Sequence, residues 1–140
     1  MIGRSILAAA SPNSSSAPTL RQQDSSERET MASYMIQVSY TTAAVAAFIA
    51  NPQDRSDVIR KAIESLGGKM HSLYLAFGEY DIVGMFDMPD NISAAAFAAA
   101  IKAGGACKAV KTTPLLSAAE GVAVQKKAAS ANYKSVVSKK

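Results

Sequence analysis

Gly78-Glu79-Tyr80-Asp81-Ile82-Val83 follows directly on the apolar run Leu73-Tyr74-Leu75-Ala76-Phe77, and this stretch decides the fold. A glycine and one polar residue between two alternating segments are typical of a two-residue type II′ hairpin, in which glycine takes the first central position. We therefore predict two antiparallel strands at 69–77 and 80–88, joined by Gly78 and Glu79.

The register of this hairpin sorts its side chains onto two faces. On one face it pairs Phe77 with Tyr80, Leu75 with Ile82, Leu73 with Gly84 and His71 with Phe86. This face is mostly apolar, so we expect helices to cover it, with Gly84 allowing one of them a close approach. The other face carries Ser72, Tyr74, Ala76, Asp81, Val83, Met85 and Asp87. His71 and Asp81 then point to opposite sides of the sheet, which argues against a His–Asp pair within the chain.

The flanking segments complete a repeated pattern. Alternation predicts a strand at 34–40, and an Ala-rich stretch at 41–50 is compatible with a short helix. Asn51 and Pro52 predict the start of an amphipathic helix that ends at Gly67-Gly68. A second helix at 92–103 and an edge strand at 106–116, which contains Pro114, follow. The order is that of a ferredoxin-like β-α-β-β-α-β sandwich, an α+β fold with a four-stranded antiparallel sheet.

The second face of the predicted sheet is too apolar to be left in water. Val83 and Met85 lie on it, and Met35 joins them if the first strand is aligned as expected. Soluble monomers seldom expose such a patch, and strands that are apolar on both sides need cover on both sides. We therefore expect a homodimer packed sheet to sheet, which is a dimeric α/β barrel.

Charge and composition divide the chain into three parts. Residues 1–32 predict a disordered extension or a translation start assigned too early, although their Ser-rich, Arg-bearing sequence is also compatible with a targeting segment. Residues 33–116 form the predicted domain. Residues 117–140 hold five Lys against one Glu, which accounts for the whole net charge of +4, and Ser117 to Glu120 predict a capped short helix before a basic tail.

Composition excludes several classes of function. A single cysteine, Cys107, excludes an internal disulfide and a multi-cysteine metal cluster, and no apolar stretch is long enough to span a bilayer. The neutral domain argues against a nucleic-acid surface. No motif for nucleotide phosphates, zinc or a serine nucleophile occurs, so we expect no cofactor and no metal.

Several blocks of the chain resemble the GYD domain family, in the same order and spacing. They are Tyr34–Thr41, Ser65–Lys69, Leu73-Tyr74, Gly78-Glu79-Tyr80-Asp81, Asp87–Asp90 and Val110–Thr113, which together cover about residues 33–120. The resemblance implies a dimeric α/β barrel and no settled chemistry. The motif is also similar to the ligand-sensing domain of leucine-responsive bacterial regulators, although no DNA-binding helix-turn-helix precedes it here. A cytoplasmic bacterial protein is the corresponding expectation.

Four residues are candidates for ligand binding, and each has a structural alternative. His71, the one histidine, suits a general base or an ordinary packed position. Tyr80 either points its hydroxyl into a cleft or anchors the hairpin, and Tyr74 faces a ligand or a partner subunit. Asp81 either holds a ligand amine or accepts backbone N–H bonds beside the turn. Gly78 and Glu79 complete the motif, with Glu79 in solvent.

Two classes of function remain open. The chain is either a small dimeric module that binds or senses a metabolite, or a cofactor-independent enzyme of the monooxygenase or isomerase kind. The absence of a matched acid–base pair favours the binding module, whereas only fold analogy favours the enzyme.

Overall fold

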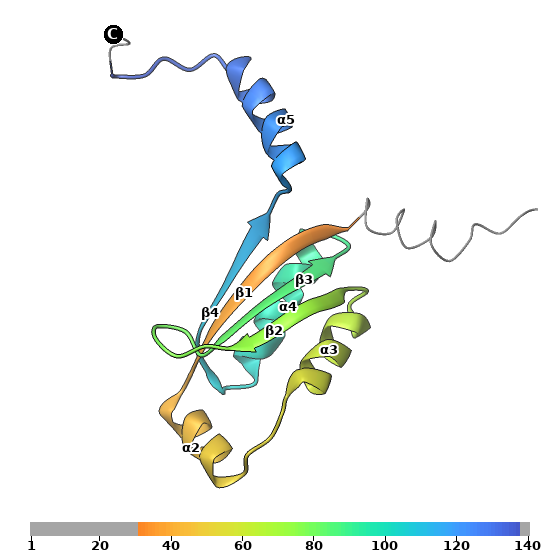
Figure 1. Ribbon diagram of the computed structural model, residues 1–140, viewed down its shortest axis with the longest axis vertical. Coiled ribbons are helices and arrows are strands. Elements are labelled where there is room, and N and C mark those ends of the chain that lie inside the picture. The colour runs from red at the N-terminus through yellow and green to blue at the C-terminus, as the bar shows by residue number, and fades with distance from the viewer. Residues whose placement is uncertain (1–30, 138–140) are drawn as a thin grey trace, which may run out of the picture.

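The first strand, β1 (Ala32–Tyr40), lies inside a four-stranded antiparallel sheet (Figure 1). Its neighbours are β3 (Ile82–Met88) and β4 (Cys107–Leu115), and β2 (Lys69–Leu75) pairs with the far side of β3. The structure is a computed structural model and describes residues 31–137. The α+β class and the antiparallel sheet are confirmed, and the strand order is consistent with a ferredoxin-like fold.

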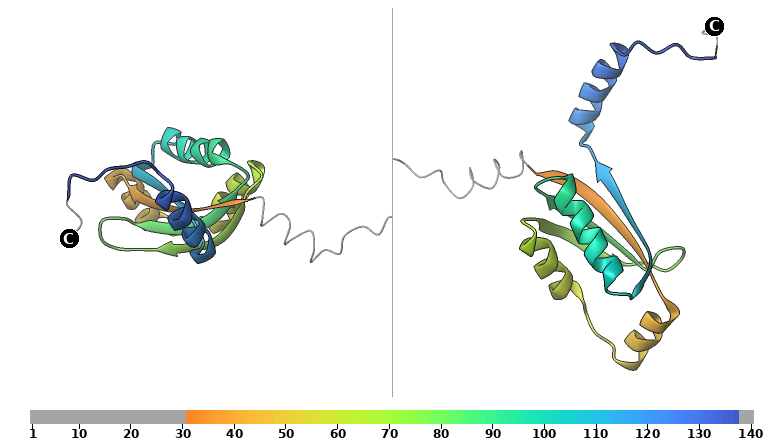
Figure 2. Two further views of the ribbon diagram at one scale, coloured as in Figure 1. Left: turned by 90° about the horizontal axis from the view of Figure 1, so that it is seen from above. Right: turned by 180° about the vertical axis from the view of Figure 1, so that it is seen from behind.

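Two helices cover one face of the sheet (Figure 2). Helix α3 (Ser56–Ser65) packs on β2, and α4 (Asn91–Ala103) packs on β3 and β4. The short helix α2 (Thr42–Ala50) lies beyond the end of the sheet, and α5 (Ala118–Ala129) projects away after β4. None of these described helices is long and apolar enough to cross a membrane.

The core lies between the sheet and these two helices. Aromatic rings form its centre, because Phe86 contacts Tyr34 at 5.6 Å and Phe97 at 5.3 Å between ring centroids. The Tyr34 hydroxyl donates a 2.6 Å hydrogen bond to Asn91 Oδ1, which joins β1 to the start of α4. Alternate positions of β1 and β3 supply most of the other buried side chains, as the alternation predicts. The buried apolar set is Tyr34, Ile36, Val38, Ile63, Phe86, Met88, Ala94 and Phe97.

The first long helix begins later than predicted. The short Ala-rich helix does form, and Asn51 lies at its C-terminal end, where its N–H donates to the Ala47 carbonyl at 2.9 Å. The prediction that Asn51 and Pro52 start the next helix is therefore wrong. Helix α3 begins at Ser56, whose N–H donates to Asp54 Oδ1 at 2.8 Å. Its predicted end is confirmed, because Gly67 has a φ of 83°.

The hairpin loop is longer than the two residues that the sequence predicts. Regular pairing stops at Leu75 and Ile82, and the Ala76 N–H donates to the Asp81 carbonyl at 2.7 Å. The type II′ turn is therefore a wrong prediction. The loop also bonds to β1, because the Asp81 N–H donates to the Val38 carbonyl at 2.8 Å.

A β-bulge at His71 alters the predicted register of β2. Leu75 pairs with Ile82 and Leu73 with Gly84 as expected, but Met70 rather than His71 pairs with Phe86. The extra residue shifts the alternation by one position, so the predicted pairing of His71 is wrong.

Gly84 differs from expectation in its close neighbour. A side chain at Gly84 would meet Leu73 Cδ1 at 3.1 Å and the Ser72 carbonyl oxygen at 3.2 Å, so the close approach is to β2 and not to a helix. The tightest approach is at Gly68, where a Cβ would lie 2.5 Å from the Asp87 carbonyl oxygen.

None of the described helices covers the face of the sheet opposite α3 and α4 (Figure 2). Met35 pairs with Met85 and so lies on the same face, as the sequence predicts, and Tyr74 pairs with Val83 beside them. Tyr74 is 67% exposed and Met85 is 39% exposed. We call this set, Met35, Tyr74, Val83 and Met85, the open face.

Of the predictions for the two ends of the chain, only the one for the C-terminal end falls within the described residues. Ser117 caps α5 through a complete capping box with Glu120, as its sequence predicts. The disordered extension and alternative start proposed for residues 1–32 fall almost wholly outside the described residues.

Candidate functional site

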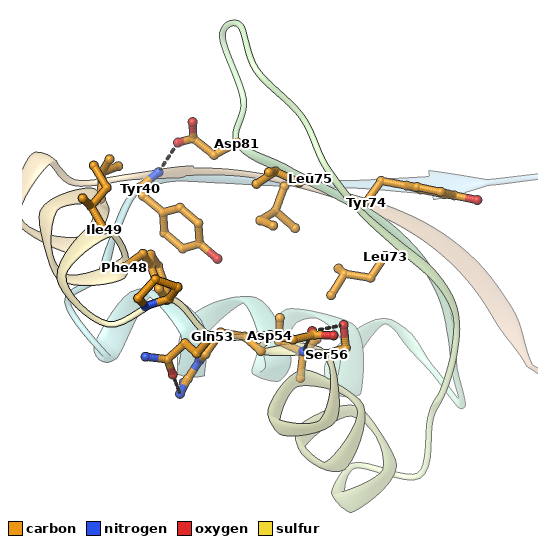
Figure 3. Close-up of a pocket in the computed structure, with 15 residues that line it drawn as sticks. Tyr40, Phe48, Ile49, Gln53, Asp54, Ser56, Leu73, Tyr74, Leu75 and Asp81 are labelled. Atoms are coloured by element: carbon orange, nitrogen blue, oxygen red, sulfur yellow. Dashed lines mark hydrogen bonds between the residues drawn. The ribbon is translucent and has the colours of Figure 1, made fainter.

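A cavity of about 570 Å³ lies at the end of the sheet, between α2, the 51–55 segment and the ends of β2 and β3 (Figure 3). Its size is within the range of small-molecule sites in proteins. Most of its wall is apolar and comes from segments that are far apart in the sequence. The apolar lining consists of Val45, Phe48, Ile49, Pro52, Ile59, Leu73, Leu75 and Ile82.

Helix α2 forms one wall of the cavity and is unusual in its composition. It has no charged residue, and none of its side chains is buried. Ile49 is 75% exposed and Val45 is 40% exposed, although both line the cavity. Phe48 contacts Tyr40 with 5.1 Å between ring centroids. The apolar side of α2 therefore faces a space that the described residues leave unfilled.

Tyr40 lies at the end of β1 and points its hydroxyl into the cavity (Figure 3). This hydroxyl makes no hydrogen bond with another described residue. Burial raises the pKa of the Tyr40 phenol above its ordinary value of 10.0, and Cys107 adds to the rise. Arg55 acts in the opposite direction on the same pKa. At neutral pH the phenol is therefore a protonated donor that is available to a ligand.

The hairpin motif holds Tyr40 in place. The Tyr40 N–H donates to Asp81 Oδ2 at 2.7 Å, and the Ser39 hydroxyl donates to the Glu79 carbonyl at 2.7 Å. Together with the bond from Asp81 N–H to Val38, these contacts join the loop to three successive residues of β1. Gly78 at the loop has a φ of 153°, a conformation that residues with a side chain rarely adopt. The motif thus has a structural role that positions a cavity residue.

The charged side chains of the cavity differ in whether the protein already supplies them with close hydrogen-bond partners. Both carboxylates have partners within the protein, since Asp81 binds the Tyr40 N–H and Asp54 binds the N–H and hydroxyl of Ser56. The bonds from Ser56 hold the pKa of Asp54 below its ordinary value of 3.8. Arg55 differs, because it forms no ion pair within the described range and bonds only to Gln53 Oε1, at 3.4 Å.

A second cluster lies on the other side of the sheet, at the opposite end from α2. His71 Nε2 lies 2.6 Å from Asp87 Oδ2, and the Ser33 hydroxyl donates to Asp87 Oδ1 at 2.7 Å. The Asp87 side chain is 9% exposed and that of His71 is 39% exposed. The expectation that the chain lacks a His–Asp pair is therefore wrong. The bulge brings the imidazole to the carboxylate, and strict alternation excludes that contact.

The four candidate residues do not form one site. Asp81 and Tyr74 line the cavity, although the Tyr74 ring points away from its centre (Figure 3). His71 belongs to the second cluster, and Tyr80 is half-buried without lining the cavity. Glu79 is exposed and contributes its carbonyl oxygen to the motif.

Sequence reasoning missed three important residues. Tyr40 and Arg55 belong to the cavity, and Asp87 belongs to the His71 cluster. One signal for the bulge was present, because Met70 and Leu73 are apolar residues three positions apart, a spacing that a regular strand places on opposite faces. The cavity had no local signal, since its walls come from three separate segments.

The chain thus folds into a small α+β domain with a cavity of about 570 Å³ at the end of its sheet. The family model for the GYD domain matches residues 34–124, so the chain belongs to the GYD domain family. This match confirms the family that the motif blocks indicate. A search of the curated proteins finds no match.

Among solved structures, the chain is similar to MtbAldR, which is known from a crystal structure. The two share 18% sequence identity with a TM-score of 0.41. The alignment covers 61% of this chain and 52% of MtbAldR, so the chain spans about half the length of that protein.

Proposed function

We propose that this GYD-family protein is a binding or sensing module whose small-molecule ligand occupies the cavity beside α2. The observation that carries the proposal is the cavity of about 570 Å³ itself, with an apolar wall and a phenol that makes no hydrogen bond within residues 31–137. An apolar helix whose side chains are not buried by protein gains stability when a ligand covers it. A cytoplasmic location and a bacterial source remain predictions from the sequence.

We also propose that the module is a homodimer packed through the open face. Met35, Val83 and Met85 form a continuous apolar strip across β1 and β3, with Tyr74 at its side. Burial of such a strip against a second copy removes it from water, and the result is a dimeric α/β barrel. The cavity lies on the helix side of the sheet, so this dimer leaves it accessible.

Native mass spectrometry of the full-length chain, purified gently from its host, tests both parts. We expect a dimer that carries a reproducible extra mass. Leu73→Trp places a larger side chain in the cavity wall and should remove that mass, whereas Leu116→Trp, at an exposed position outside the cavity, should keep it. A retained mass in Leu73→Trp means that the ligand lies elsewhere, and a monomer means that the open face is covered in another way.

The His71–Asp87 contact favours a second candidate, a cofactor-independent enzyme. An imidazole held by a buried carboxylate is an arrangement that general bases use. In the proposed dimer, His71 lies at the rim of the barrel interior. Exchange of solvent deuterium into an enolisable ketone, such as phenylacetone, tests this candidate. Exchange that His71→Gln abolishes in an intact dimer supports it, and exchange no faster than in buffer for the wild type counts against it.

A further inference from the structure

We infer that the ligand of the α2 cavity is an amphipathic carboxylate, with its apolar body against α2 and its head group between Arg55 and Tyr40. This inference rests on the proposed function and specifies the chemistry of the same site. It follows from a comparison of the polar groups in the cavity that already have hydrogen-bond partners in the described chain with those that have few or none.

The apolar part of the ligand is set by the walls. Phe48, Ile49 and Val45 from α2 face Leu73, Leu75 and Ile82 from the strands across the cavity. No described side chain fills the space between them, and α2 has no buried residue of its own. A body with an aromatic ring or a branched chain matches these walls, and the Tyr40 and Phe48 rings offer an edge for stacking.

The head group is set by the polar atoms that remain available. The carboxylates of Asp54 and Asp81 each accept hydrogen bonds on one oxygen, from Ser56 and from the Tyr40 N–H respectively, so both already have donors within the protein. Arg55 is the one cation among the lining residues, and among the described residues its side chain has a single long hydrogen bond and no ion pair. The Tyr40 hydroxyl supplies a second donor that points into the same space (Figure 3).

The two donors belong to residues that line the same cavity. The Arg55 charge lowers the Tyr40 pKa against the effect of burial, which places the guanidinium within electrostatic range of the phenol. A guanidinium fork and one hydroxyl match the two oxygens and the single charge of a carboxylate. Because Arg55 is exposed, the head group lies at the mouth of the cavity, where it keeps part of its hydration.

Three probes with the same body and different heads test the inference. They are 3-phenylpropanoate, 3-phenylpropanol and 3-phenylpropylamine, titrated into the full-length chain after co-purified compounds have been dialysed away. We expect the carboxylate to bind about tenfold more tightly than the alcohol and the amine to bind most weakly. The preference should shrink in 0.5 M salt, since screening weakens the contact with an exposed cation.

Matched variants assign the preference to residues. Arg55→Gln should reduce carboxylate affinity to that of the alcohol and leave alcohol affinity unchanged. Arg60→Gln removes the same charge from the exposed side of α3, where Arg60 pairs with Asp57 at 2.6 Å, and should keep the preference. Tyr40→Phe should weaken the carboxylate several-fold while the domain stays folded.

The outcomes separate this inference from the proposed function. Equal binding of carboxylate and alcohol, abolished by Leu73→Trp, confirms the cavity and overturns the head group. Tighter binding of the amine overturns it as well. If none of the three probes binds the wild type, both the inference and the cavity as a binding site are wrong.

Discussion

The imidazole of His71 and the carboxylate of Asp87 meet at 2.6 Å although their strands, in regular register, would not bring them together. The contact exists because the bulge in β2 turns His71 toward the side of the sheet on which Asp87 lies. Ser33 on β1 completes the cluster, so one buried carboxylate connects three strands. Such a group stabilises the fold as long as its partners are present.

The first prediction concerns this cluster. Asp87→Ala should lower the free energy of unfolding by about 1–3 kcal/mol, since it leaves two polar partners without an acceptor. His71→Ala should cost about 1 kcal/mol or less, because a half-exposed contact is screened by solvent. Urea unfolding measures both. Asp57→Ala, whose carboxylate lies in an exposed pair, is the control and should change stability least. An Asp87→Ala variant as stable as this control contradicts the structural role.

The second prediction concerns Gly68. An alanine there would place its Cβ 2.6 Å from Met88 Sδ and 2.8 Å from Ile63 Cγ2, so α3 and β3 would have to move apart. We expect a loss of about 1–3 kcal/mol in thermal or urea unfolding. Gly121→Ala is the matched control, because nothing lies within 4 Å of its added Cβ in α5, and a helical alanine is favourable. Equal stability of the two variants would contradict the close approach.

The third prediction concerns Cys107, the single cysteine of the chain. Burial raises the pKa of its thiol above the ordinary value of 9.0. Because the folded chain disfavours the thiolate, alkylation by iodoacetamide should rise with pH later than in the urea-unfolded chain. The same shift means that this group's contribution to stability is complete below pH 9 and declines as the pH rises toward the folded pKa. Coincident alkylation profiles for folded and unfolded chains would contradict the shift.

The fourth prediction separates two residues of the hairpin motif. Asp81→Ala removes the acceptor for the Tyr40 N–H and should cost about 1–3 kcal/mol in urea unfolding. Glu79→Ala should be nearly neutral, since the Ser39 hydroxyl binds the Glu79 carbonyl oxygen and not its side chain. Greater sensitivity to Glu79→Ala than to Asp81→Ala would show that the motif works through a different contact.

Local chemistry made much of the fold predictable. The alternation of β1 and β3, the glycine pair that ends α3 and the capping box at Ser117 each depend on residues that are neighbours in sequence. The start of α3 was misjudged because Asn51, which the sequence suggests as an N-cap, is the C-cap residue of α2.

The site was much less predictable, for a physical reason. The hairpin loop is opened by bonds to Val38, Ser39 and Tyr40, which lie about forty residues earlier in the chain. Motif reasoning therefore identified Asp81 but assigned it no connection to Tyr40. Arg55 had no distinguishing pattern, since its importance comes from the absence of an ion pair with any other residue in 31–137.

The bulge at His71 also has a genetic consequence. Met70 and Ser72 pair with the consecutive residues Phe86 and Met85 and so lie on opposite faces of the sheet, with His71 as the additional residue between them. Loss of codon 71 would join two segments of β2 whose side chains already alternate in phase. A related gene can therefore gain or discard this imidazole by a one-codon insertion or deletion, without changing any other pair in the sheet.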